Sequence, residues 1–144
     1  MNLFGMLEVS GSALTAERQR AEVVTSNMAN AETTRTAEGG PYQRQLVVFH
    51  ARQARQFPMM LAALGSTATR GVQVDQVVAD GKAPIRRYQP GHPDADAQGF
   101  VAYPAIDPVE ETADLLGAVR AYELNASAVQ ATKTMIQQSL DLLR

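Results

Sequence analysis

The residues best suited to chemistry are His92, Asp94 and Asp96, which place an imidazole and two carboxylates within one short segment. A metal site needs three or four converging ligands, so a metal-dependent hydrolase is the enzymatic hypothesis for this sequence. Asp94, Asp96 and Gly99 also match the start of a calcium-binding loop, but Ala105 stands where that loop requires its closing glutamate. We therefore expect a turn held by aspartate side-chain hydrogen bonds, with no bound metal.

Three other motifs have simpler structural explanations than catalysis. Glu110 and Glu111 form a carboxylate pair suited to acid–base chemistry, but in the first turn of a helix we expect them to serve as capping and dipole partners. Gly39–Pro41 lacks the lysine and the following helix of a phosphate-binding loop, so we interpret it as a sharp turn. His50 has no recognisable partner nearby in the sequence. The sequence thus predicts neither a catalytic site nor a cofactor.

The composition limits the classes of protein that remain. The 144 residues suit one domain, or one core with an insertion. The 13 Lys and Arg are scattered against 15 Asp and Glu, which excludes the basic stripe of a nucleic-acid-binding protein. The longest stretch without charge, Gln56–Thr69, is too short to span a membrane, and Glu8 falls where a signal peptide would be apolar. Because the sequence has no Cys, it has neither a disulfide nor a thiolate ligand.

Residues 107–144 are predicted to form one long helix. Asp107 is a good N-cap and Pro108 suits the first helical position. Gly117 is the only glycine in this stretch, and the helix would be roughly 55 Å long. Its stripe repeats in alternating steps of four and three, and eight of its nine residues are apolar: Leu115, Val119, Tyr122, Ala126, Val129, Lys133, Ile136, Leu140 and Leu143.

Residues 1–30 follow a similar repeat, but the first turns contain weak helix formers such as Gly5. We expect the stable part of this helix to begin near Ala13, and the preceding residues to become ordered only against a partner. Near the end of the helix, Asn27 and Asn30 lie one turn apart. Either Asn30 ends the helix in the left-handed conformation, or both amides form a polar ladder with a neighbouring subunit.

The middle of the chain, residues 31–106, has a different character. It contains most of the glycines, prolines and aromatic residues. Gln56–Arg70 is expected to be a loop containing a helical turn. Four short strands, β-branched or aromatic and bounded by Gly or Pro, are predicted at Tyr42–His50, Gly71–Ala79, Ile85–Tyr88 and Phe100–Tyr103.

These elements predict a mainly α fold with a small β-rich insertion. Residues 1–30 and 107–144 are expected to pair as an antiparallel coiled coil and to form a helical core domain, with 31–106 as the insertion. A two-helix pair buries only one side of each apolar stripe, and exposed surface of this kind usually marks an assembly interface. The apolar residues that remain uncovered include Val9, Val23, Leu116, Leu124 and Met135.

Several motifs resemble those of the bacterial flagellar axial proteins, the family of rod, hook and hook-associated proteins. The motifs similar to the N-terminal signature of this family are Ser12–Ala16, Arg20, Ser26–Ala31 and Thr33–Thr34. The motifs similar to its proximal-rod members are Glu38–Tyr42, Pro90–Asp96, Gly99–Pro104 and Arg120–Asn125. Their order and spacing agree over nearly the whole chain, except for residues 51–70.

The resemblance implies a non-enzymatic structural subunit of the basal-body rod, the drive shaft that crosses the periplasm. Such subunits are exported by the flagellar type III apparatus without a cleaved signal peptide. They assemble helically with copies of themselves and with other rod proteins, and they neither bind nucleic acid nor insert into a membrane. The expected subunit-interface residues are Leu14, Ala21, Val24, Asn27, Met28, Asn30, Val119, Tyr122, Asn125, Val129, Ile136, Leu140 and Leu143.

Two other interpretations remain at this point. One is a different flagellar axial or adaptor subunit, against which the segments Gly39–Tyr42 and Pro90–Pro93 argue. The other is a free-standing coiled-coil adaptor or export chaperone. A chaperone of this kind forms a discrete dimer, whereas a rod subunit is monomeric or aggregates.

Overall fold

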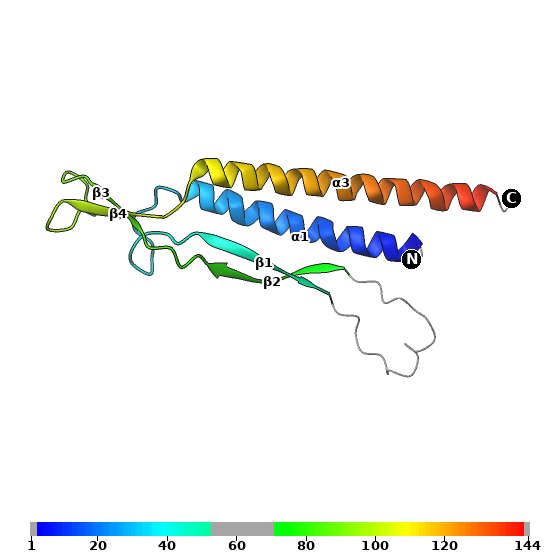
Figure 1. Cartoon of the computed structure of the whole chain (residues 1–144), viewed down its shortest axis with the longest axis horizontal. Coiled ribbons are helices and arrows are strands. Elements are labelled where there is room, and N and C mark those ends of the chain that lie inside the picture. Colours follow the sequence, from blue (N-terminus) through cyan, green and yellow to red (C-terminus); the bar gives the residue numbers. More distant parts are fainter. Residues whose placement is uncertain (1–2, 53–70, 143–144) are drawn as a thin grey trace, which may run out of the picture.

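Two long helices dominate the computed structural model, which describes residues 3–52 and 71–142. Helix α1 (Leu3–Ala29) and helix α3 (Pro108–Asp141) lie side by side in opposite directions, so that both ends of the chain lie at the same end of the molecule (Figure 1). The mainly α fold with a small β-rich insertion is confirmed. The predictions for Gln56–Arg70 and for Leu143 lie outside the described residues.

Helix α3 begins where its sequence predicts. The carboxylate of Asp107 accepts a hydrogen bond of 2.9 Å from the Val109 N–H, and Pro108 occupies the first turn, where its missing N–H costs nothing. Its 34 residues give a length of about 51 Å, against about 40 Å for the 27 residues of α1. Helix α3 therefore extends past the N-terminal end of α1 (Figure 1).

Helix α1 begins at Leu3, so the expected start near Ala13 was wrong. Tertiary contacts explain the difference, because they outweigh the low helix propensity of these turns. The Ser12 hydroxyl donates to the carbonyl of Val9 at 2.7 Å and accepts from the N–H of Val72 at 3.0 Å. A weak helix former is thus one of the residues that attach the helix to the insertion.

The insertion consists of two antiparallel strand pairs. Strand β1 (Gln45–Ala51) pairs with β2 (Val72–Ala79), and β3 (Ile85–Tyr88) pairs with β4 (Phe100–Tyr103). The β1–β2 pair runs along α1, whereas β3–β4 lies beyond the helix pair, at the end away from the termini (Figure 1). All four predicted strands are confirmed, with β1 beginning at Gln45 and not at Tyr42.

The contact between the helices differs from the predicted stripe. On α3, Val119 and Lys133 are exposed, and the buried positions are Ala118 and Thr132, each one residue earlier. On α1, the buried apolar side chains are those of Ala16 and Val24. Small side chains allow the two backbones to approach closely, and Val119, Tyr122 and Leu140 of the predicted repeat are exposed. The helix pair was predicted correctly, but the side of α3 that faces α1 was not.

Glycines make two turns of the insertion. Gly39 and Gly40 have φ values of 88° and 77°, which confirms the sharp turn before Pro41. Gly99, with φ of 82°, leads into β4, and a Cβ atom there would lie 2.9 Å from the ring of Tyr88 and 3.2 Å from Pro90.

Replacing Gly99 by Ala is expected to destabilise the β3–β4 pair by about 1–3 kcal/mol, because the new residue must hold a left-handed conformation against a close contact. The measurement is amide hydrogen exchange at Gln89, whose N–H donates to the Gly99 carbonyl at 2.8 Å. Gly91→Ala is the matched control, because a Cβ atom added at Gly91 would meet no atom within 4 Å and Gly91 has no positive φ. Equal exchange in the two variants would contradict the prediction.

Candidate assembly interface

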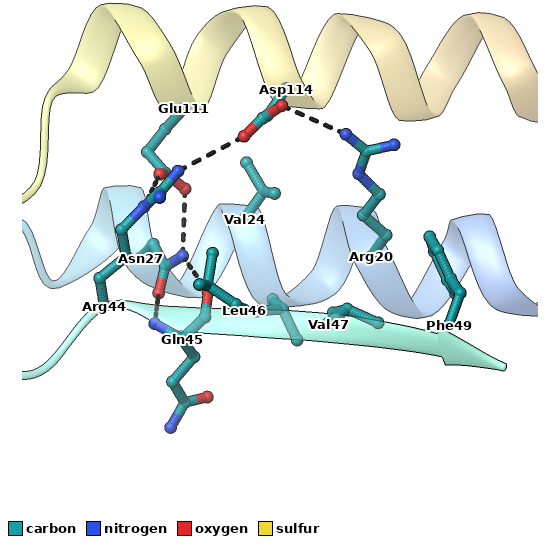
Figure 2. A pocket seen from close by; sticks show the side chains of 11 residues that line it. Arg20, Val24, Asn27, Arg44, Gln45, Leu46, Val47, Phe49, Glu111 and Asp114 are labelled. Atoms are coloured by element: carbon teal, nitrogen blue, oxygen red, sulfur yellow. Dashed lines mark hydrogen bonds and ion pairs between the residues drawn. The ribbon is translucent and has the colours of Figure 1, made fainter. Parts of the chain in front are cut away.

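A buried polar cluster joins the two helices to the insertion. We call Asn27, Arg44, Gln45 and Glu111 the junction cluster; they come from the end of α1, the start of β1 and the first turn of α3 (Figure 2). The Arg44 Nε donates to Glu111 Oε1 at 2.5 Å, and the Asn27 amide donates to Glu111 Oε2 at 3.0 Å. Glu111 has no exposed surface and Asn27 has 1 %. The cluster therefore fixes three separate segments at one point.

The main chain of β1 is held by the same amide. Asn27 donates to the carbonyl of Gln45 at 2.8 Å, and its side-chain oxygen accepts the Gln45 N–H at 2.9 Å. Tyr42 adds a third contact, because its hydroxyl donates to the Asn27 oxygen at 3.1 Å. With these bonds every polar group of the Asn27 side chain has a partner, as burial requires.

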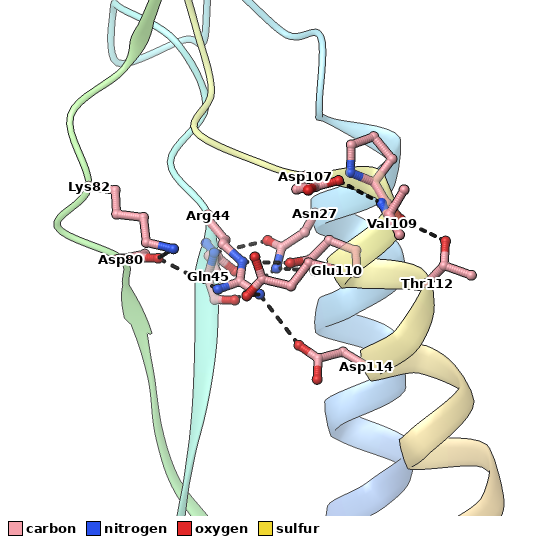
Figure 3. Close-up of polar contacts among 12 residues, drawn as sticks. Asn27, Arg44, Gln45, Asp80, Lys82, Asp107, Val109, Glu110, Thr112 and Asp114 are labelled. Carbon is pink, nitrogen blue, oxygen red and sulfur yellow. Dashed lines mark hydrogen bonds and ion pairs between the residues drawn. The ribbon is translucent and has the colours of Figure 1, made fainter.

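Arg44 lies among four carboxylates (Figure 3). Besides Glu111, its guanidinium nitrogens lie 3.4 Å from Glu110, 3.4 Å from Asp114 and 3.6 Å from Asp80. Burial opposes the charge of Arg44, but the hydrogen bond and charge of Glu111, with the charges of Glu110 and Asp114, outweigh it and raise the pKa of Arg44 above its ordinary value. Arg44 therefore keeps its positive charge throughout the physiological pH range.

The prediction for Glu110 and Glu111 was incomplete. Both lie in the first turn of α3 as expected, but their interpretation as capping and dipole partners overlooked Arg44, which binds both of them. Nothing in the local spacing reveals this contact, because Arg44 and Glu111 are 67 positions apart.

The structure excludes one of the two interpretations of Asn30. Its amide donates to the Ser26 carbonyl at 2.9 Å, and its oxygen accepts the Thr33 hydroxyl at 3.1 Å. No non-glycine residue in the described part of the chain has a positive φ, so the left-handed cap at Asn30 was wrong. The Asn30 amide instead stabilises the turn that follows α1.

A set of large apolar side chains on α3 faces solvent. At about 100° per residue they fall on two flanks, one on each side of the contact with α1. The first flank comprises Val119, Tyr122 and Leu140, which are 42–60 % exposed, whereas Leu116, at 53 %, lies nearly opposite the contact with α1. The second flank comprises Leu124, Met135 and Leu142, which are 41–88 % exposed. Apolar surface on both sides of one helix is typical of a helix that packs between neighbours.

The predicted interface residues fall into three groups within the described chain. Val119, Tyr122 and Leu140 are exposed on the first flank, whereas Val24 and Asn27 are buried inside the chain. The half-buried residues, which border the contact between the helices or the turn after α1, are Leu14, Ala21, Met28, Asn30, Asn125, Val129 and Ile136.

The residues singled out for chemistry are engaged in internal bonds. Asp96 accepts the N–H groups of Gln98 at 2.8 Å and Phe100 at 2.9 Å, which confirms the expected aspartate turn, and Arg86 binds its other oxygen at 2.6 Å. Asp94 accepts the Thr34 hydroxyl at 2.8 Å. Among the residues with described positions, no group of three or more His, Cys, Asp or Glu is placed to hold a metal ion.

The two helices differ from membrane-spanning segments in their hydropathy. Within residues 3–52 and 71–142, neither helix is long and apolar enough to cross a membrane.

Comparisons with known proteins place both helices in one group. Residues 7–35 match the family described as flagella basal body rod protein, and residues 97–142 match the C-terminal family of the flagellar basal body rod proteins FlgEFG. The chain is 39 % identical to the flagellar basal-body rod protein FlgC of Bacillus subtilis, over 99 % of both chains. It is 36 % identical to FlgC of Borreliella burgdorferi over 100 % of this chain and 99 % of that one, and 38 % identical to FlgC of Escherichia coli O157:H7 over 99 % and 98 %.

Replacing Arg44 by Met is expected to lower the free energy of unfolding by about 3–5 kcal/mol, because it leaves the buried carboxylate of Glu111 without its cation. Urea unfolding of the purified chain measures the change. The double variant Arg44→Met with Glu111→Met is the control, and it is expected to recover part of the loss, since it also removes the buried charge. A loss below about 1 kcal/mol in the single variant would contradict the buried pair.

Asp96 is expected to titrate below the ordinary aspartate pKa of 3.8. The N–H of Phe100, followed by the N–H of Gln98 and the charge of Arg86, outweighs desolvation and lowers the pKa of Asp96. Its stabilising contribution is thus present above the ordinary pKa and is lost as the pH falls through the lowered one. In an NMR titration Arg86→Gln should raise this pKa, yet keep it below 3.8, since both main-chain bonds remain. An unchanged pKa would exclude the ion pair as a contributor.

Proposed function

Because the chain belongs to the FlgC family of flagellar basal-body rod proteins, we propose that α1 and α3 build the wall of the rod by packing against neighbouring subunits through the two flanks of α3. The protein is a non-enzymatic structural subunit of the rod, and membership of this family implies that it assembles with other rod subunits. The proposal concerns which of its surfaces do so.

The exposure of α3 carries this proposal. Among the described helices and strands, α1 packs against α3, β1 and β2, whereas α3 packs against α1 alone. Burying one large apolar side chain contributes about 1.5–3 kcal/mol, so covering both flanks stabilises an assembly strongly. Val119, Tyr122 and Leu140 are the predicted interface residues most available for this contact.

The two flanks also favour a particular kind of assembly. They carry different side chains, so a contact between the first flank of one subunit and the second flank of the next is heterologous. Heterologous contacts that do not close into a ring generate an open helix, which is the symmetry of a shaft. Many small packing contacts along a helix of about 51 Å are then available to transmit torque.

In this proposal, the buried members of the predicted interface set fix the position of the residues around them. Val24 and Asn27 hold α1 against α3 and β1, and thereby set the direction in which the half-buried residues face a neighbour.

The route by which the chain reaches the rod belongs to the same proposal. Export by the flagellar type III apparatus without a cleaved signal, and a position spanning the periplasm, are supported by the resemblance of the whole chain to rod proteins.

Replacing Val119 by Asp is expected to abolish swimming in a strain that lacks the native gene, because a charge would be buried between subunits. The unfolding free energy of the purified variant should change by less than about 1 kcal/mol, since the site is exposed in the isolated chain. Swimming on soft agar and electron microscopy of basal bodies are the measurements.

Ser127→Asp is the matched control, because it adds the same charge at a polar position on the same helix. Ser127 is exposed and lies about 180° around α3 from Ala118, on the side opposite the contact with α1. This variant should swim and assemble a complete rod. A motile Val119→Asp strain with normal basal bodies would overturn the proposed use of the first flank.

A further inference from the structure

The β3–β4 pair belongs to a separate end of the molecule. Among the described helices and strands, β3 and β4 pack only against each other, and they lie beyond the helix pair (Figure 1). The segment that follows α1 is attached to them by polar contacts: the Thr34 hydroxyl donates to Asp94 at 2.8 Å, and Arg35 lies 3.6 Å from the same carboxylate. We call residues 31–43 and 84–105 together the outer unit.

Four connections join the outer unit to the rest of the chain, and all of them start beside the junction cluster. They follow the end of α1, precede β1, follow the end of β2 and precede α3. Asn27, Arg44 and Glu111 of the junction cluster come from three of these points. Asp80 marks the fourth, because its carboxylate lies 3.6 Å from the Arg44 guanidinium and its N–H donates to the Arg44 carbonyl at 2.6 Å (Figure 3).

The guanidinium of Arg44 joins two of these points in fixed directions. Its Nε binds Glu111 in the first turn of α3, whereas its Nη1 lies close to Asp80 at the end of β2. A guanidinium is planar and holds its five N–H donors in a rigid geometry, so the two contacts set the end of β2 and the start of α3 at a defined angle. Arg44 is only 8 % exposed, so little water competes for either contact.

A small rotation of the outer unit would displace its surface by the width of a packing contact. The four residues of β3 span about 13 Å, so a rotation of about 20° at the base would move the far end of this strand by about 4–5 Å. Apolar atoms are in contact only within about 4–4.5 Å, so this displacement removes a contact or creates a clash. Ile85 and Tyr88 of β3 are 46 % and 66 % exposed, so large side chains would be displaced.

We propose that Arg44 is a positioning residue for assembly, which sets the direction of the outer unit relative to the flanks of α3. Subunits packed side by side through these flanks must accommodate one another's outer units, so the assembly requires one direction of this unit. Arg44 contacts no neighbour in this proposal and acts through Asp80 and Glu111. The inference rests on the proposed function and adds a requirement beyond coverage of the flanks.

The double variant Arg44→Met with Glu111→Met separates positioning from stability, because an apolar pair can stabilise a buried site as well as an ion pair does but forms no directional bonds. Spin labels on Ser127→Cys of α3 and Ile85→Cys of β3, in a chain without native Cys, report the distance between the helices and the outer unit by pulsed electron paramagnetic resonance. This distance is expected to shift by several ångström, or its distribution to broaden. Labels on Ser127→Cys and Gln19→Cys, exposed on the two helices, are the control pair and should keep the native distance.

Asp80→Ala is the milder variant, because it leaves Arg44 bound to Glu111 and removes only the contact with the end of β2. It is expected to broaden the distance distribution between Ser127→Cys and Ile85→Cys, and it decides the test if the double variant does not fold. Lys82→Ala is its matched control, since it removes the other cation beside Asp80, at 3.6 Å, and should keep the native distribution. A native distribution in every folded variant would overturn the positioning role.

Swimming and electron microscopy of basal bodies report the consequence for assembly. In a strain that lacks the native gene, the double variant of Arg44 and Glu111 is expected to lose swimming although its purified chain folds. Native swimming together with an altered distance would overturn the requirement for one direction of the outer unit. Failure of the proposed function is distinguishable, because the distances are measured in the isolated chain and the flank contact is read from the Val119→Asp strain.

Discussion

A pair of long helices can bury only one face of each helix, and this constraint governs the rest of the structure. Helix α1 meets it with two neighbours, α3 on one side and the β1–β2 pair on another. Helix α3 has only α1 among the described elements, so its remaining apolar side chains stay in contact with water. We propose that a chain built this way completes its apolar burial in an assembly, which agrees with its membership of the FlgC family of rod proteins.

Small side chains and one polar cluster take the place of a large apolar core. Ala16, Ala118 and Thr132 allow close approach of the helices, but they contribute little apolar area. The pair of Arg44 and Glu111 fixes the insertion against the end of the helix pair at a defined point. Buried ion pairs are weak sources of stability, because desolvation opposes the Coulomb attraction. The junction cluster therefore serves mainly to orient the insertion on the helices, leaving the flanks of α3 free.

Local signals predicted the elements, and long-range contacts decided the details that the sequence did not reveal. Asp107 and Pro108 identify the start of α3, and the strands are marked by β-branched or aromatic runs. The side of α3 that faces α1 was missed because a count of apolar residues favours Val119, whereas close approach selects Ala118. The junction cluster was missed because its members are joined only by the fold. The start of α1 was missed for the same reason, since it depends on the contact of Ser12 with β2.

Protection of α3 on assembly is the most direct measurement of whether its flanks are covered. A Leu124→Cys chain would be labelled with a maleimide both as the purified protein and in isolated basal bodies, with urea-unfolded samples giving full reactivity. Leu124 is 72 % exposed in the isolated chain, so the purified protein should react at nearly the unfolded rate. Strong protection in basal bodies is the expected result. Reaction at the same rate in basal bodies and in the purified chain would contradict the claim that assembly covers this surface.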